Sequence, residues 1–247
     1  MRKFIISIDA GTTSNRSILF DLKGKPVFSS QKEFTQYFPK SGWVEHNPEE
    51  IWRTTIKTLK DVIQKAKKLR GEILNIGITN QRETTVLWDK RTGKPVYNAI
   101  VWQDRRQEEF CSKLRKQNKE TMIFNKTGLL IDSYFSGTKI KWILDNVPKA
   151  KKLMSSNQLL FGTIDSFLIW RFTKGKIHAT DATNASRTMI YNITSNRWDE
   201  TILKLLKIKK NILPVVKDCA DDFGQTHSSI TGKSIPINGV VGDQQSA

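Results

Sequence analysis

The feature that most constrains the fold is a turn with apolar arms near the N-terminus, "ISIDAGTTSNRSILFD" at residues 6–21. The arms, Lys3–Asp9 and Arg16–Asp21, are rich in isoleucine and phenylalanine, which is typical of buried strands. A Walker-type phosphate loop contains Gly-Lys-Ser or Gly-Lys-Thr and leads into a helix. This turn lacks that motif and leads into a second strand-like segment. We therefore expect a β-hairpin with hydroxyls and backbone N–H groups at its tip. It is either an ordinary polar turn or an anion site with Asp9 beside it.

The following segments alternate between strand and helix patterns. A helix is expected to begin at Asn47, with Pro48 in its first position and Glu50 completing a capping box. Strands are expected at residues 4–8, 17–20, 27–33, 73–79, 84–89, 98–103 and 232–243, and further helices at 104–116, 137–146, 164–172 and 199–206. A three-strand antiparallel meander followed by βα units predicts a mixed α/β sheet.

Composition narrows the possible compartments and partners. No apolar run approaches the roughly 20 residues of a membrane helix, and the N-terminus does not resemble a signal peptide, so we expect no membrane partner. The two cysteines, Cys111 and Cys219, indicate a reducing cytoplasm. The net charge of +17 allows a nucleic-acid-binding protein. A solvated lysine-rich face is the alternative we favour, because no zinc-finger or RNA-recognition pattern is present.

Polar and aromatic residues stand at the ends of several expected strands. Arg82 and Glu83 follow one strand, where the ordinary interpretation is a surface salt bridge. Trp102 could instead pack in the core or at its edge, and Tyr134 could be a buried tyrosine with a hydrogen-bonded hydroxyl. Asp243 could simply cap a helix. Together they place acidic, basic and aromatic groups where open α/β sheets bind ligands.

Several motifs then identify a family. "DAGTTSNR", "GWVEHNPEEIW", "GITNQRETTVLWD", "NAIVWQDRR", "SYFSGTK", "DATNASRTM" and "GDQQSA" occur in order from residue 9 to the last residue. Together they resemble the glycerol-phosphorylating members of the FGGY carbohydrate kinase family. The resemblance implies two actin-like (ribonuclease H-like) domains with a cleft between them, of which residues 1–247 match the first. It also implies a homo-oligomer at full length. Without the second domain, a non-catalytic remnant is the alternative.

The resemblance also implies roles for individual residues. ATP phosphates would be held by Thr12, Thr13, Ser14 and Arg16 in the hairpin, and Mg²⁺ by Asp9 and Asp243. Glycerol would be bound by Arg82, Glu83, Trp102, Tyr134, Asp243 and Gln244. Asp243 would be the general base for the attack of a glycerol hydroxyl on the γ-phosphoryl group.

Overall fold

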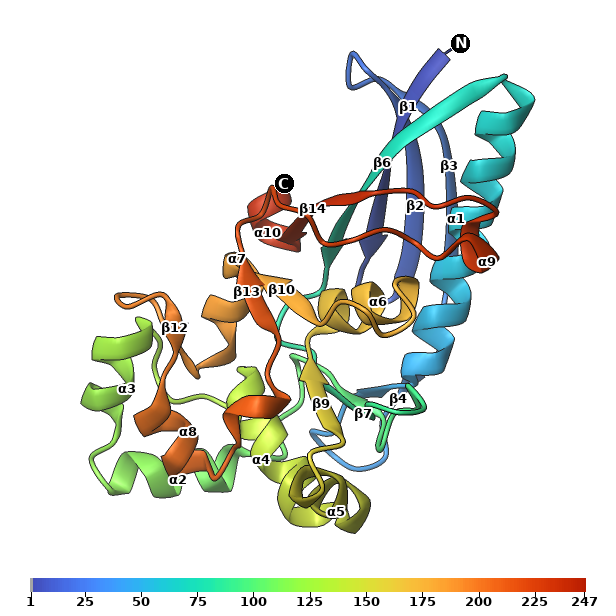
Figure 1. The fold of residues 1–247 in the computed structure, drawn as a ribbon. Coiled ribbons are helices and arrows are strands. Elements are labelled where there is room, and N and C mark those ends of the chain that lie inside the picture. The colour runs from blue at the N-terminus through green and yellow to red at the C-terminus, as the bar shows by residue number, and fades with distance from the viewer. Residues whose placement is uncertain (1) are drawn as a thin grey trace.

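The largest sheet of the computed structural model, which describes residues 2–247, is a five-stranded mixed sheet (Figure 1). Its strands are β1 (Arg2–Ala10), β2 (Ser14–Asp21), β3 (Pro26–Glu33), β6 (Gly71–Asn80) and β14 (Ile237–Gly242), in the order β14-β6-β1-β2-β3. The first three strands are antiparallel, while β6 runs parallel to both β1 and β14. The predicted meander and mixed α/β class are therefore confirmed.

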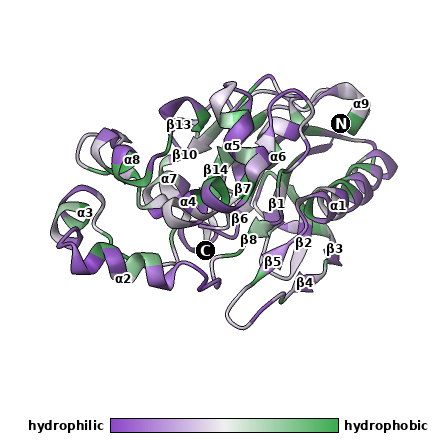
Figure 2. Cartoon of the chain, turned by 90° about the horizontal axis from the view of Figure 1, so that it is seen from below, coloured by the Kyte–Doolittle hydropathy of each residue, from purple (hydrophilic) through white to green (hydrophobic). Residues whose placement is uncertain are grey.

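The helix α1 (Pro48–Lys68) packs along β2 and β3 and covers one face of this sheet. Hydrophilic and hydrophobic residues alternate around it, as expected for an amphipathic surface helix (Figure 2). Asn47 caps the helix by accepting a hydrogen bond from the backbone N–H of Glu49. The predicted capping box is wrong, because the Glu50 carboxylate instead contacts the backbone N–H and hydroxyl of Thr35, each at 3.3 Å.

Two hydrophobic cores lie on either side of an antiparallel ribbon made of β7 (Val86–Asp89) and β9 (Leu159–Gly162). Trp88 belongs to the core under the main sheet, and its neighbour Leu87 belongs to the second core. Consecutive strand residues point to opposite faces, which is why every residue of β7 is buried.

The remaining helices complete both cores. The first core includes α6 (Ile164–Phe172). The second gathers helices lying apart from the main sheet in Figure 1. Those helices are α2 (Glu108–Lys116), α3 (Glu120–Thr127), α4 (Ser136–Asn146), α5 (Pro148–Ser155) and α8 (Glu200–Leu206). Shorter elements are β4 (Gln36–Tyr37), β5 (Glu45–His46), β8 (Ala99–Ile100), β10 (Ala179–Asp181), α7 (Ala182–Ala185), η1 (Ser186–Thr188), β11 (Tyr191–Asn192), β12 (Arg197–Trp198), η2 (Lys210–Ile212), β13 (Val215–Lys217), α9 (Ser228–Thr231) and α10 (Asp243–Ser246).

Several of the predicted boundaries are displaced. The helix expected from Asp104 begins at Glu108, because the Asp104 carboxylate binds the backbone N–H groups of Val44 and Arg106 and holds a turn. The strand expected at residues 98–103 is only Ala99–Ile100. The strand expected at residues 232–243 begins at Ile237. Gly232, with φ +82°, instead ends α9. Within residues 2–247, no helix combines the length and apolar character needed to cross a membrane.

Candidate active site

The hairpin turn between β1 and β2 is held in place by its carbonyl groups. Gln81 donates its side-chain N–H to the Gly11 carbonyl at 2.8 Å, and Gln36 donates to the Thr12 carbonyl at 3.1 Å. Thr13 uses its carbonyl to accept from the Phe34 N–H. The backbone N–H groups of Thr12 and Thr13 make no hydrogen bond within residues 2–247. The tip thus offers donors, which is the arrangement an anion requires.

The predicted phosphate and metal residues occupy this same turn. Arg16 pairs with Asp9 at 3.0 Å across the hairpin, and both side chains are partly exposed. Ser14 accepts a hydrogen bond from Gln31 through its hydroxyl oxygen. Asp9 lies in register with Thr79 of β6, which in turn is in register with Val241 of β14. β1 and β14 therefore end on the same side of the sheet, with β6 between them. Asp9 near the end of β1 and Asp243 directly after β14 lie at this side.

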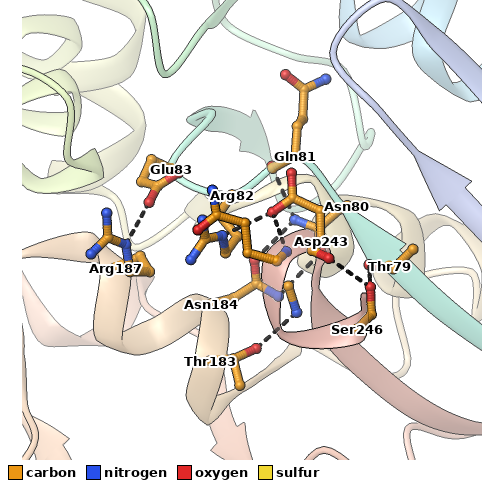
Figure 3. A network of polar contacts seen from close by, with 12 residues as sticks. Thr79, Asn80, Gln81, Arg82, Glu83, Thr183, Asn184, Arg187, Asp243 and Ser246 are labelled. Carbon is orange, nitrogen blue, oxygen red and sulfur yellow. Dashed lines mark hydrogen bonds and ion pairs between the residues drawn. The ribbon is translucent and has the colours of Figure 1, made fainter.

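Arg82 and Glu83 lie in the connection that follows β6, and both are buried. The surface salt bridge considered from the sequence is wrong, because each side chain has a different partner. Arg82 donates from Nε to Asp243 Oδ1 at 2.9 Å, whereas Glu83 accepts from Arg187 Nε at 2.7 Å (Figure 3). Burial raises the pKa of the Glu83 carboxyl, and the hydrogen bond from Arg187 acts in the opposite direction.

Asp243 is the first residue of α10, directly after β14. The N-cap position belongs to Gly242, so the simple capping role considered for Asp243 is wrong. Its side chain is 45% exposed, while that of its partner Arg82 is only 5% exposed. Asp243 thus has a carboxylate that is accessible to solvent and is held by a hydrogen bond from the buried Arg82 guanidinium. Gln244 follows it and is exposed.

Trp102 and Tyr134 connect the hairpin to the buried acid. The Trp102 indole N–H donates to the Thr12 hydroxyl at 3.0 Å, and its ring centre lies 5.5 Å from that of Tyr134. The Arg187 guanidinium lies 5.6 Å from the centre of the Tyr134 ring and also binds Glu83. The structure therefore connects Thr12, Trp102, Tyr134 and Glu83 through Arg187. Within residues 2–247, no side-chain hydrogen bond or ion pair links the Asp9–Arg16 pair or the Arg82–Asp243 pair to these residues.

Three further residues of this region had no role assigned from the sequence. Arg187 pairs with Glu83, Thr183 contacts the strand end at Gly242, and Asn184 bonds Asn80 at the end of β6. All three residues lie in the motif "DATNASR", which supported the family resemblance but was given no functional role of its own. A cavity of about 850 Å³ lies elsewhere, between the start of α1 and residues 91–98, and none of the predicted site residues lines it.

Comparison with known proteins gives the family of this chain. Residues 4–247 match the FGGY family of carbohydrate kinases, N-terminal domain, so the chain belongs to this family. It is 56% identical over 247 residues to glycerol kinase of Rhizobium meliloti (strain 1021) and 58% identical to that of Sinorhizobium fredii (strain NBRC 101917 / NGR234). All of the chain aligns in both cases, and it spans about half the length of each relative.

Solved structures agree with this assignment. Glycerol kinase of Plasmodium falciparum, crystallised with ADP, superposes with a TM-score of 0.96 at 38% identity, over 99% of this chain and 49% of that chain. Gluconate kinase from Lactobacillus acidophilus superposes with a TM-score of 0.86 at 26% identity, over 98% of this chain and 48% of that chain. The chain thus has the fold of the first half of these kinases, as the motifs implied.

Proposed function

We propose that this chain carries the glycerol-binding and phosphate-binding half of an ATP-dependent kinase that converts glycerol to sn-glycerol 3-phosphate. The observation that carries the proposal is the Arg82–Asp243 pair, in which a buried guanidinium holds a half-exposed carboxylate at the end of β14. The glycerol kinases among its relatives and the ADP in one solved structure support the choice of substrates.

Asp243 acts as the general base. Its carboxylate accepts the proton of a terminal glycerol hydroxyl as that oxygen attacks the γ-phosphoryl group of ATP. Arg82 holds the carboxylate in one orientation and can donate to a glycerol hydroxyl from its remaining N–H groups. A base fixed in this way needs little rearrangement during the reaction.

The hydroxyl groups and carbon edge of glycerol require different partners. Glu83 accepts hydrogen bonds and Arg82 donates them, which suits a ligand whose hydroxyls do both. Trp102 and Tyr134 form the wall for its carbon atoms, and Gln244 adds an amide beside Asp243. Loss of one hydroxyl would leave a buried polar group unpaired, so the site discriminates against smaller alcohols.

The hairpin holds the phosphates of ATP. The unpaired backbone N–H groups of Thr12 and Thr13 would donate to the anion, together with the hydroxyls of these residues and with Ser14 and Arg16. Mg²⁺ would be held by Asp9 and Asp243, and bound Mg²⁺ neutralises charge on the transferred phosphoryl group. The donor set fits, because magnesium sites of kinases combine one or two carboxylates with phosphate oxygens. Within residues 2–247 no cluster of three or more acidic, histidine or cysteine residues could hold a metal by itself.

The test is ATP-dependent phosphorylation of glycerol by the purified protein, with Asp243→Asn as the isosteric control. The assay is run on the 247-residue chain alone and after adding the separately expressed C-terminal half of the Sinorhizobium fredii enzyme. Turnover that falls by about 10²-fold or more in the control supports the proposal. Equal turnover of the two proteins would remove Asp243 as the base. Absence of turnover in both arrangements would favour a non-catalytic chain.

A further inference from the structure

The motif "DATNASR" forms a short segment, residues 181–187, none of whose residues has a role in the proposed reaction. Asp181 ends β10 and caps α7 by accepting hydrogen bonds from the backbone N–H groups of Thr183 and Asn184. Asn184 also donates from its side chain to Asp181 Oδ1 at 2.8 Å. Asp181 and Asn184 are fully buried, so the segment is anchored from beneath.

One end of this segment holds the strand that leads to the base. The Thr183 hydroxyl donates to Asp181 Oδ2 at 2.5 Å, which fixes its orientation. Its oxygen then accepts the backbone N–H of Gly242 at 2.8 Å (Figure 3). Gly242 directly precedes Asp243, so this hydrogen bond restrains the backbone at the point where β14 becomes α10.

The middle of the segment is tied to the strand that leads to Arg82 and Glu83. The side chains of Asn184 and Asn80 exchange hydrogen bonds in both directions, at 2.9 and 3.1 Å. Asn80 is the last residue of β6, and both amides are buried. Movement of residues 181–187 relative to β6 would break these hydrogen bonds and leave buried amide groups unpaired, which costs free energy.

The other end of the segment carries Arg187, which is bound to Glu83 at 2.7 Å. Glu83 is 1% exposed and has a backbone φ of +61°, a conformation that costs energy for a non-glycine residue. Within residues 2–247, Arg187 is the only cation in an ion pair with Glu83. The guanidinium also lies 4.9 Å from the centre of the Phe135 ring, which limits its movement.

We propose that residues 181–187 are a positioning clamp that sets the two carboxylates of the site relative to each other. Thr183 positions Asp243 through the Gly242 N–H, and Arg187 positions Glu83 directly. Both are positioning residues for glycerol phosphorylation, so the inference rests on the proposed function. A misplacement of about 1 Å is enough to reduce catalysis by two orders of magnitude, which gives such a clamp a clear purpose.

The Thr183 contact is tested with Thr183→Val, which keeps the shape of the side chain and removes its hydroxyl, and with Thr183→Ser, which keeps the hydroxyl. Steady-state kinetics are measured for both variants in the assay described above, with the C-terminal half of the Sinorhizobium fredii enzyme added. We expect kcat to fall about 10- to 100-fold in Thr183→Val, with a smaller change in the KM for glycerol, and to recover largely in Thr183→Ser.

The Arg187 contact is tested with Arg187→Met and Arg187→Lys. The Met variant should raise the KM for glycerol by about tenfold or more, with a smaller effect on kcat, and the Lys variant should lie between it and the wild type. The charged and titratable groups facing Glu83 are Arg187, Arg82, Lys139 and Tyr134. Loss of Arg187 favours the neutral acid, so the KM of Arg187→Met should rise more steeply as pH is lowered from 8 to 6.

The outcomes separate the clamp from the proposed function. A wild-type protein that does not phosphorylate glycerol overturns the proposed function, and the clamp with it. Active wild type with unchanged kinetics in Thr183→Val and Arg187→Met overturns the clamp alone. An equal loss in Arg187→Met at all pH values would indicate a purely structural contact and would also overturn it. If Thr183→Val does not fold, as judged by thermal unfolding, the Arg187 pair decides.

Discussion

Gly242 lies directly beneath the alkyl part of Arg82. A Cβ atom on Gly242 would come within 2.4 Å of Arg82 Cδ and 2.8 Å of its Cγ, which is closer than real Cβ atoms approach their neighbours. The glycine before Asp243 is therefore required by a side chain 160 positions earlier, because the backbone φ of Gly242 is an ordinary −63°. Space, not backbone conformation, excludes a side chain here.

Gly242→Ala should consequently displace Arg82 and break its hydrogen bond to Asp243. We expect kcat/KM for glycerol to fall by about 10- to 100-fold, in line with the loss of one charge-assisted hydrogen bond. Gly239→Ala is the matched control in the same strand, because the nearest atom to its added Cβ would lie at 3.8 Å. Equal kinetics for the two variants would contradict this assignment.

Asp165 should make stability depend on pH. Its carboxylate is fully buried in the first turn of α6 and accepts hydrogen bonds from Thr163 at 2.5 Å and Thr180 at 2.6 Å. Burial, with the charge of Asp181, raises the pKa of Asp165 to about 7 from an ordinary value of 3.8. A raised folded-state pKa in an acid means that its stabilising contribution is present below pH 4 and is lost as pH rises to 7.

The comparison with Asp165→Asn isolates this effect. Between pH 4 and 7, the unfolding equilibrium constant of the wild type should increase relative to that of the variant, by up to about tenfold per pH unit. Urea unfolding of both proteins at pH 5, 6 and 7 measures it. Parallel pH profiles would show that Asp165 has a normal pKa in the folded protein.

Arg106 should not tolerate replacement by lysine. Its guanidinium is buried against the rings of both Trp43 and Trp142, at 3.8 and 4.6 Å from their centres, and it pairs with Asp104 and Glu45. A lysine cannot stack in this way or bind both acids in one plane.

We expect Arg106→Lys to lower the free energy of unfolding by about 2 to 4 kcal/mol. The neighbouring Arg105→Lys is the matched control, because Arg105 and its partner Asp132 are both exposed. Its cost should stay below about 1 kcal/mol. Chemical denaturation of both variants gives the comparison, and similar losses would argue against a special role of the stacked site.

Gly137 in α4 should be another required glycine. Alanine favours a helix over glycine by about 1 kcal/mol. Here its Cβ would meet Ile190 at 2.9 Å and the Thr188 carbonyl at 3.0 Å. Gly137→Ala should therefore destabilise the protein by about 1 to 3 kcal/mol. Gly77→Ala, with no neighbour closer than 4.0 Å, is the control for thermal unfolding. A stabilised Gly137→Ala would show that the packing there is loose.

Local signals in the sequence were enough for the hairpin and α1. The apolar arms around the turn and the cap at Asn47 each act within a few residues, so their structures could be predicted directly. The capping box failed because Glu50 has a competing partner, Thr35, that comes close only in the folded chain. The same limit applies to Asp165, because its place in the first turn of α6 is local in sequence, whereas its complete burial depends on the folded chain.

The site itself depends on contacts between distant segments. Arg82 and Asp243 are 161 positions apart and meet because β6 and β14 are neighbours in the sheet. No local pattern reveals this pairing, and the family motifs supplied the residues without their partners. Glu83 looked exposed in a polar loop, yet the packing of Arg187 against it places it in the interior.

The ribbon of β7 and β9 has a consequence for how the protein comes apart. Leu87 and Trp88 are adjacent in sequence and face different cores, so neither core can release this ribbon without exposing the apolar side chains of the other. The two cores thus share the β7–β9 ribbon, so unfolding of either core would expose apolar side chains of the other. We therefore expect a single cooperative unfolding transition, although each core has its own set of helices.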